Sequence, residues 1–541
     1  MRALSEESRK RLTLLACILG SGIALLDGTV VNVALPSIQR ALGGGLAAQQ
    51  WVANGYLLTL GSLILVGGSL GDVFGERRVF ALGVLAFGVA SLACALAPTI
   101  GVLVAARALQ GVAGALLVPG SLAVIVNTFQ GAERGPAIGS WTAWGAIAGV
   151  LGPLAGGELL AVASWRWVFV INIPLALLCA ALILVAMPAS DRGIDEGRGG
   201  MRRRVDVVGG LLAAAALGGP VFALIEQPRL GWSSAAVIGP LVAGGMLMVA
   251  FLAYEARAAD PMLPLGLFRR RNFSAGNIET FAMYAGLAVL FFFLVLFLQQ
   301  VGGYTPLESG LAVLPVTVVL FGLSRRFGAL ADRYGPRLFM GAGPLVAAVG
   351  LLGFERVGLP VRYVQDVLPG QLLFAVGLSM TVAPLTAAVL SDASPSQAGI
   401  ASGVNNAIAR VAGLIGTAAL GAVVASAFTS TLDRKLASVN LGPAARAAVG
   451  QAKRLPLGLP DVHALPGAQA RALRAAAEAA SLHSFRLSVA VAAALVGLGG
   501  VVGFAGIRNP RRSVSAADCP GGSLVGASRE LARVPYAGSR T

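Results

Sequence analysis

Long apolar runs separated by short polar segments are the dominant pattern along this chain of 541 residues. A helix needs about 17 to 25 predominantly apolar residues to cross a bilayer. By that measure the pattern predicts fourteen spans, at 12–36, 51–71, 79–97, 101–127, 136–162, 166–188, 206–226, 235–255, 272–300, 306–330, 338–357, 366–390, 398–428 and 484–507. The chain is therefore predicted to be an all-α polytopic membrane protein, with two blocks of six spans and two extra spans between them.

The spans divide the chain into three units, an N-terminal six-helix bundle at 1–188, two extra linker helices at 189–265 and a C-terminal six-helix bundle at 266–508. The long connection 429–482 is expected to be extracytoplasmic, with short alanine-rich helices near 443–453 and 467–482. The polar tail 509–541 has the composition of a disordered segment, and we expect it in the cytoplasm.

Basic residues gather in connections on one side of the predicted membrane, at 9–11, 77–78, 134, 192–204, 269–271, 325–337 and 508–512. An excess of lysine and arginine of this kind marks cytoplasmic loops. The connection 429–482 also holds basic residues, but long loops cross the membrane largely regardless of charge. We therefore expect both termini in the cytoplasm and the chain in the plasma or inner membrane of the cell.

The composition supports a membrane protein and excludes several classes of function. Charged residues make up 12% of the chain, against about 25% in soluble domains. The net charge of +16 comes from the orienting clusters, so it does not indicate nucleic acid. Lysine stands only at Lys10, Lys435 and Lys453 and never after glycine, which excludes a phosphate-binding P-loop. Because histidine stands only at His463 and His483, we expect no metal site, no cofactor and no enzyme activity.

A short motif occurs twice, each time between the second and third spans of a block. The segment GSLGDVFGERR at 68–78 recurs as GALADRYGPR at 328–337, an offset of 260 residues. The motif positions are Gly68, Asp72, Gly75, Arg77 and Arg78 in the first copy, and Gly328, Asp332, Arg333, Gly335 and Arg337 in the second. The repetition indicates that the two blocks are copies of one unit, as in many secondary transporters.

On this repeated motif the chain resembles the major facilitator superfamily, and within it the fourteen-span branch of drug:proton antiporters, over about residues 10–508. The resemblance implies the major facilitator fold. It also implies that Asp72 and Asp332 pair with the loop arginines or cap a neighbouring helix, as a charge latch that breaks when the two halves rock. The first copy departs from the family pattern, because Val73 replaces the usual arginine after the aspartate.

The first span carries a carboxylate within an apolar run. The segment LDGTVVNVALP at 26–36 resembles the first-span motif of the multidrug antiporters. A carboxylate inside a span costs about 2.5 to 3.5 kcal/mol, so it persists mostly where it faces a cavity or a partner. Asp27 is therefore a candidate for proton binding or cation recognition. The alternative is a packing residue that a neighbouring hydroxyl satisfies.

The fourth span carries an arginine on a polar stripe. Arg107, Gln110, Gly111 and Gly114 follow one another at helical spacing and share one face. The stripe is similar to the family's fourth-span arginine motif, in which the arginine is taken to influence proton transfer. A buried guanidinium favours the charged form of a nearby carboxylate and can couple protonation to conformation. The alternative is an arginine that reaches the membrane surface.

The fifth span is rich in small residues, namely Gly145, Gly149, Gly152, Pro153, Gly156 and Gly157. Small residues at this spacing allow close helix approach, and proline permits a bend. The stripe resembles the antiporter motif that the family associates with export, and this resemblance implies a gate helix. The segments 165–167 and 172–174 resemble the same branch.

Two further ionisable residues are candidates for the transport path in the second block. Glu279 lies about a third of the way into the ninth span, with no basic residue within one turn. Arg410 lies in the middle of the thirteenth span and could pair with such a carboxylate. Glu158, Glu226 and Glu255 fall near predicted span ends, where a solvated position is expected.

These features together predict a proton-coupled exporter of hydrophobic or cationic compounds, working by alternating access between two bundles. The proton motive force would drive it without a cofactor, because one proton gains about 2.3 kcal/mol per 100 mV. The expected partners are the lipid bilayer, protons and small substrates, with no nucleic acid, and the chain is expected to act as a monomer. The alternatives are a dedicated exporter of one endogenous metabolite or antibiotic, and a membrane receptor or enzyme that transports nothing.

Overall fold

A computed structural model describes residues 5–187, 205–391 and 398–509. Throughout these residues the regular secondary structure is helical. Fourteen helical segments are long and apolar enough to cross a membrane, which confirms the number predicted from the sequence. The predicted disordered tail lies, from residue 510 onward, outside the described residues.

The N-terminal unit consists of α1 (Glu6–Leu42), α2 (Leu46–Phe74), α3 (Glu76–Leu96), α4 (Ile100–Thr128), the turn η1 (Gly131–Glu133), α5 (Arg134–Val162), α6 (Trp167–Val170) and α7 (Asn172–Ala186). Helix α4 packs between α2 and α3, and α1 packs against α5 and α7. Side chains of Ser5 and Thr99 cap the starts of α1 and α4. At the turn between α2 and α3, Gly75 has a φ of 92°, a conformation that other residues rarely adopt.

Two helices, α8 (Val207–Leu230) and α9 (Ala235–Glu255), follow and pack against each other. Helix α8 also packs against α2 of the N-terminal unit and α15 of the C-terminal unit. The extra pair therefore lies beside one of the two seams between the units.

The C-terminal unit consists of η2 (Leu265–Arg269), α10 (Arg271–Ala288), η3 (Val289–Leu294), α11 (Val295–Gln300), α12 (Pro306–Tyr334), α13 (Pro336–Leu352), η4 (Gly353–Arg356), η5 (Tyr363–Val367), α14 (Leu368–Ser391), α15 (Ala398–Leu436), α16 (Pro443–Arg454) and α17 (Gly467–Gly506). Helices α10, η3 and α11 follow one another without a break and form one long span. Helix α13 packs against α14 and α17, and α10 packs against α15 and α17.

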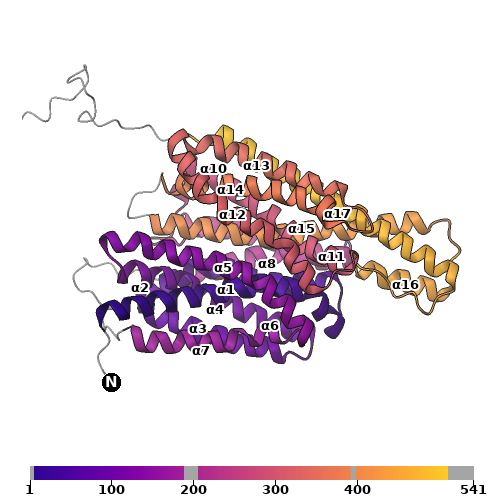
Figure 1. The fold of residues 1–541 in the computed structure, drawn as a ribbon, viewed down its shortest axis with the longest axis horizontal. Helices are drawn as coiled ribbons and strands as arrows, with labels where there is room; N and C mark the ends of the chain where they lie inside the picture. Colours follow the sequence, from indigo (N-terminus) through magenta and orange to yellow (C-terminus); the bar gives the residue numbers. More distant parts are fainter. Residues whose placement is uncertain (1–4, 188–204, 392–397, 510–541) are drawn as a thin grey trace, which may run out of the picture.

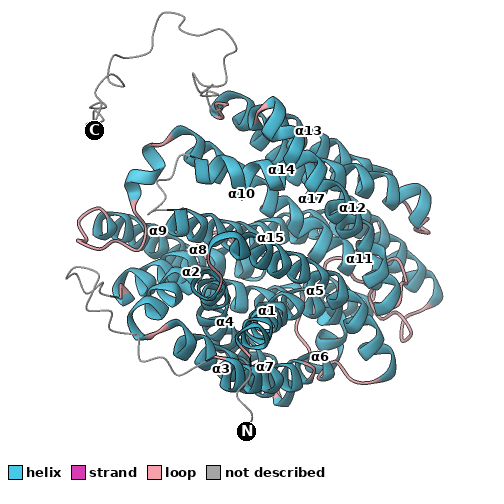
Figure 2. Cartoon of the chain, turned by 60° about the vertical axis from the view of Figure 1, so that its left-hand side comes forward, coloured by secondary structure: helices cyan, strands magenta, loops and turns pink. Residues whose placement is uncertain are grey.

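The long helices run side by side along the long axis of the molecule (Figures 1 and 2). Helix α16 lies at one end, on the right in Figure 1, and we call this end the α16 end. The opposite end carries the two motif turns at Gly75 and Gly335 with their arginines, and we call it the arginine end.

The last helix is longer than the sequence pattern predicts. The apolar run predicts a span from 484, but α17 begins at Gly467 and has 40 residues. Its first four turns pack with α15 and α16 around a small core that includes Phe428, Leu432 and Leu473. Hydropathy misses this part because it is rich in alanine and charged residues, so the predicted helix at 467–482 is the beginning of the final span.

The sixth predicted span consists of two consecutive helical segments. Helix α6 ends at Val170 and α7 begins at Asn172. Ile171 between them keeps helical dihedral angles, with φ −57° and ψ −28°, so the two segments form one span, and the Asn172 side chain bonds Asp27 inside the N-terminal unit.

The two units meet along α2 with α15 and along α5 with α12. Within the residues that the structure describes, two side-chain hydrogen bonds cross between the N-terminal and C-terminal units. Gln50 Nε2 donates to the carbonyl of Thr417 at 2.6 Å, and Gln299 Nε2 donates to the carbonyl of Val33 at 3.0 Å. Both bonds lie in the half of the molecule toward the α16 end, since Gln50 is near the start of α2 and Gln299 is near the end of α11.

The seam between α5 and α12 is tight at the α16 end and open further along. A Cβ on Gly157 would lie 2.5 Å from the Cα of Leu307, and a Cβ on Gly310 would lie 2.5 Å from the carbonyl oxygen of Pro153. By contrast, a Cβ on Gly149 would meet no atom within 4 Å. The structure is therefore closed between the units at the α16 end.

Candidate functional site

Asp27 and Arg107, which are 80 residues apart in the sequence, form an ion pair inside the N-terminal unit. Asp27 lies on α1 and is 0% exposed, and Arg107 lies on α4 and is 1% exposed. Arg107 Nη1 donates to Asp27 Oδ2. The structure thus brings together two of the residues that the sequence singled out.

Polar side chains from three helices complete the pair. The other oxygen of Asp27, Oδ1, accepts hydrogen bonds from Gln110 Nε2 at 3.0 Å and from Asn172 Nδ2 at 2.9 Å. The same two amides donate to the hydroxyl of Ser91, at 2.7 and 3.2 Å respectively. Asp27 therefore accepts three hydrogen bonds, one of them from a charged donor.

The Arg107 guanidinium has further partners. Its Nε donates to the carbonyl of Val52 at 3.1 Å, and its Nη1 also donates to Gln110 Oε1 at 2.6 Å. The ring of Tyr56 lies 4.4 Å from the guanidinium carbon, within the range of a cation–π contact. These contacts exclude a position at the membrane surface for Arg107. The cluster links α1, α2, α3, α4 and α7.

Glu279 lies on α10 in the C-terminal unit and has no comparable partners. It is 0% exposed, and neither of its carboxyl oxygens has a hydrogen-bond partner among the described residues. The side chain faces α17, because a Cβ on Gly503 would lie 3.1 Å from Glu279 Oε2. An isolated buried carboxyl is far more stable neutral than charged, so Glu279 is expected to carry a proton in this conformation.

Among the described residues Arg410 forms no ion pair with a carboxylate in this conformation, so its expected pairing stays a prediction. Arg410 is half-buried at the seam between the units. A Cβ added at Gly61 of α2 would lie 3.2 Å from the Arg410 Cβ. Glu279 faces another helix, α17, so the two side chains do not meet. The other face of α10 bonds α15 through Asn405, which donates to Thr280 Oγ1 at 2.8 Å.

The first copy of the repeated motif forms the turn between α2 and α3. Asp72 and Arg78 are exposed, and Arg77 is half-buried. The clearest contact here involves the next residue in the motif, Glu76, whose two carboxyl oxygens accept from Asn127 Nδ2 at 2.6 Å. No feature of the sequence pattern singles out Glu76 or Asn127 as a contact.

The second copy caps the end of the last helix. Arg337 Nε donates to the carbonyl of Phe504 on α17 at 2.8 Å, and its backbone amide donates to Asn509 Oδ1 at 3.0 Å. Asp332 is exposed and makes no ion pair with a loop arginine within the described residues. In this conformation the arginine, rather than the aspartate, contacts the neighbouring helix. The role of either copy as a latch stays a prediction.

The small residues of α5 face two different helices. Gly145, Gly152 and Gly156 face α1, where a Cβ on Gly152 would lie 2.0 Å from Thr29 Oγ1. Pro153 and Gly157 face α12 of the other unit. The stripe therefore joins α5 to its own unit on one side and to the opposite unit on the other. A role as gate helix stays a prediction.

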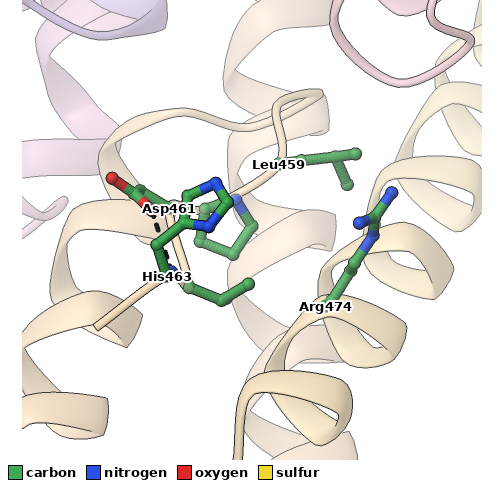
Figure 3. Close-up of a pocket in the computed structure, with 6 residues that line it drawn as sticks. Leu459, Asp461, His463 and Arg474 are labelled. Carbon is green, nitrogen blue, oxygen red and sulfur yellow. Dashed lines mark hydrogen bonds between the residues drawn. The ribbon is translucent and has the colours of Figure 1, made fainter. Parts of the chain in front are cut away.

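A shallow surface pocket of about 410 Å³ lies at the α16 end, far from these residues (Figure 3). It is lined by Leu459, Pro460, Asp461, Val462, His463 and Arg474. Asp461 Oδ1 accepts from the backbone amide of His463 at 3.0 Å, so it stabilises the turn. The His463 and Arg474 side chains lie at the surface, where they give no sign of a buried binding site.

Glu255 differs from its expected position. We expected a solvated side chain at the end of a span, as holds for the exposed Glu158. Glu255 is instead 2% exposed, because the segment after α9 folds over it and Leu263 donates its amide to Glu255 Oε2 at 3.0 Å. A solvated position for Glu255 is therefore wrong.

Two similar helical units, joined along two seams and holding carboxylates among buried helices, define a polytopic membrane protein of transporter architecture. The model of the Major Facilitator Superfamily matches residues 17–417. The chain belongs to the major facilitator superfamily.

Among relatives of known name, the puromycin resistance protein of Streptomyces alboniger is 38% identical over 76% of this chain and 81% of that protein. The tetracenomycin C resistance and export protein of Streptomyces glaucescens is 33% identical over 89% of each chain. The multidrug resistance protein Stp of Mycobacterium tuberculosis is 34% identical over 79% of this chain and 78% of that protein.

Solved structures share the fold. A bacterial homologue of the human lysosomal transporter Spinster, in an inward-facing and unoccupied conformation, has a TM-score of 0.61 with 17% identity, over 93% of this chain and 99% of that chain. The inward-open xylose transporter XylE of E. coli has a TM-score of 0.56 with 13% identity, over 93% of this chain and 97% of that chain.

Proposed function

We propose that this protein exports hydrophobic or cationic toxic compounds in exchange for protons, by alternating access between its two units. The observation that carries the proposal is the contrast between two buried carboxyls. Asp27 is paired with Arg107 and two side-chain amides, whereas neither oxygen of Glu279 has a partner among the described residues. The relatives named for drug and antibiotic resistance support export as the direction of transport.

Glu279 is the better placed of the two to carry the transported proton. Protonating Asp27 would leave the Arg107 charge buried without a counterion, which is strongly unfavourable. Glu279 gains or loses a proton without breaking an ion pair. In the proposed cycle Glu279 takes a proton from outside and releases it to the cytoplasm, while substrate moves the other way. The Asp27 cluster holds the helices of the N-terminal unit together.

We also propose that the arginine end faces the cytoplasm of a plasma or inner membrane. The basic clusters at this end support that orientation. The closed α16 end would then face outward, and substrate would enter from the cytoplasm. Because both units belong to one chain, the protein is proposed to work as a monomer with no cofactor beyond the proton gradient.

The first test compares dye extrusion by the wild type, Glu279→Gln and a matched control. Everted vesicles should accumulate ethidium when a proton gradient is imposed, and an uncoupler should stop the accumulation. One proton at about 100 mV supports a roughly fortyfold dye gradient. Glu279→Gln should reduce this gradient toward unity, because its amide cannot release a proton.

The control is Glu158→Gln, which alters an exposed glutamate and should extrude dye like the wild type. Accumulation that ignores the uncoupler would contradict proton coupling. Full proton-driven accumulation by Glu279→Gln would remove Glu279 from the mechanism while leaving export intact.

A second candidate is a dedicated exporter of one antibiotic or metabolite. The names of the puromycin and tetracenomycin C relatives favour it, since each refers to a single compound. A growth-inhibition panel of chemically unrelated drugs separates the two proposals. Protection against one structural class alone supports the dedicated exporter, whereas protection against several classes supports the broad one.

A further inference from the structure

A second pair of buried carboxylates lies outside this machinery, where the two extra helices begin and end. Asp206 caps the start of α8 and is 8% exposed, and Glu255 is the last residue of α9 and is 2% exposed. Asp206 Oδ1 accepts hydrogen bonds from the Gly209 amide at 2.7 Å and the Tyr254 hydroxyl at 3.0 Å. Glu255 Oε2 accepts from the Leu263 amide at 3.0 Å. One oxygen of each carboxyl is therefore satisfied.

The other two oxygens, Asp206 Oδ2 and Glu255 Oε1, lie next to the same space beside Gly209. No hydrogen-bond donor among the described residues reaches either of them. Both are buried and have no hydrogen-bond partner among the described residues. They lie 2.4 and 2.6 Å from the position that a Cβ on Gly209 would occupy, so they are within about 5 Å of each other. The missing side chain of Gly209 leaves that space to the two carboxyls.

Among the described residues, no basic side chain contacts either carboxyl. The side chains that pack around this joint from α2, α8, α9 and the following segment are apolar and include Leu63, Val66, Ala213, Phe251 and Met262. Tyr254 contacts the pair through its hydroxyl, while Arg257, Asp260 and Asp72 are exposed. Within the part of the chain that the structure describes, neither Asp206 nor Glu255 forms an ion pair with a basic residue.

Two carboxylates that face each other in apolar surroundings repel strongly if both are charged. A proton on one of them turns that oxygen into a donor toward the other and satisfies both atoms at once. We propose that Asp206 and Glu255 hold one shared proton, at a binding site separate from Asp27 and Glu279.

This site connects three parts of the molecule. Asp206 begins α8, Glu255 ends α9, and the Leu263 amide belongs to the segment that leads into the C-terminal unit. While the proton is bound, the start of α8, the end of α9 and this segment stay together. When the shared proton is lost, Asp206 and Glu255 both become negatively charged. Their repulsion then separates the start of α8 from the end of α9. The extra helices thereby acquire a pH-dependent joint at the arginine end.

Infrared spectroscopy of the full-length protein in lipid nanodiscs tests the site without transport. A protonated carboxyl has a carbonyl stretch that a carboxylate lacks. At neutral pH, Glu255→Gln and Asp206→Asn should each lose one such band, because the amide supplies the donor in place of the proton. Glu279→Gln should keep the band that the pair variants lose. Asp260→Asn, a nearby exposed control, should keep every band. Retention of every band in both pair variants would overturn the proposal.

Thermal unfolding of the same samples gives a second measurement. The folded pair binds a proton that separate carboxyls of the unfolded chain release, so stability should fall as the pH rises from mildly acidic to mildly alkaline. Glu255→Gln should flatten this fall. If sodium or potassium instead stabilises the wild type at neutral pH and not Glu255→Gln, the pair binds a cation and the shared proton is refuted. Because no substrate is present, these results stand apart from the outcome of the dye experiment.

Discussion

At the scale of single residues, the distribution of partners decides the properties of the buried charges. Asp27 accepts three hydrogen bonds and lies against Arg107, whereas both oxygens of Glu279 are without a partner among the described residues. An opposite charge and hydrogen-bond donors favour the charged form of a carboxyl group. Burial without partners favours its neutral form. The first helices of the two repeated units therefore hold the same functional group in opposite surroundings.

The first prediction concerns the stability of the Asp27 pair. Asp27→Asn removes the negative charge and leaves the Arg107 guanidinium buried and uncompensated, which should destabilise the protein by about 3 to 5 kcal/mol. Glu279→Gln removes no partner and should unfold close to the wild-type temperature. Thermal unfolding of the purified variants measures both. The added change Arg107→Leu should recover part of the loss in Asp27→Asn, and equal unfolding temperatures for Asp27→Asn and wild type would contradict the ion pair.

At the scale of helices, the seams between the units depend on where glycine leaves space. Helix α5 packs one set of small residues against α1 of its own unit. It packs another set against α12 of the C-terminal unit, where it closes the seam between the units. Backbones that approach this closely tolerate no added side chain. Adding a side chain on the face of α5 that packs against α12 should therefore alter the contact between the units. The same addition at a position of α5 with free space should not.

The second prediction compares two glycines of α5. Gly157→Val places a side chain against the backbone of Leu307 and should force α5 and α12 apart at the α16 end. Gly149→Val adds the same side chain where no atom lies within 4 Å, and serves as the control. A Ser309→Cys reporter, at a position that is 0% exposed on α12, measures the opening through its rate of labelling by an impermeant maleimide. Faster labelling in Gly157→Val alone is expected, and equal rates in the two variants would refute the gate.

The helices themselves could be predicted from the sequence, and the contacts of the site only in part. Fourteen spans follow from apolar runs because the bilayer demands a fixed length of apolar helix. Asp27 and Arg107 could be singled out because charges within spans are rare. That they pair with each other, and that Ser91 and Asn172 join them, depends on packing between helices far apart in the sequence. The resemblance of segment 172–174 to the family pointed to Asn172, but not to its bond with Asp27. The unpaired state of Glu279 and the burial of Glu255 likewise depend on neighbours that no periodicity reveals.

At the scale of the whole molecule, the closed end combines close packing along the seams with two side-chain hydrogen bonds between the units among the described residues. The bonds from Gln50 to Thr417 and from Gln299 to Val33 both end on backbone carbonyls. Such bonds contribute about 0.5 to 1.5 kcal/mol each, so they bias the closed conformation without locking it. A transporter that must open on both sides in turn needs interfaces of this modest strength.

The third prediction removes these two bonds. Gln50→Ala with Gln299→Ala should shift the equilibrium toward opening at the α16 end by roughly tenfold or more, since each bond contributes about 1 kcal/mol. Spin labels at the exposed positions Ala41 and Ala437 report the distance between the units at this end. Gln39→Ala removes a similar bond, to Gly44 within one unit, and should leave the distance distribution unchanged. An unaltered distribution in the double variant would show that apolar packing alone keeps this end shut.

The long hairpin of α15, α16 and α17 has one more consequence. A helix of 40 residues is about 60 Å long, roughly twice the thickness of the hydrocarbon layer. Much of the hairpin must therefore stand clear of the lipid as a rigid, folded protrusion, with Arg454 resting on the turn at Gly45 of the other unit. An antibody fragment raised against this protrusion would have an ordered epitope in water. Bound there, it would mark the protein for electron microscopy without contacting the transport path.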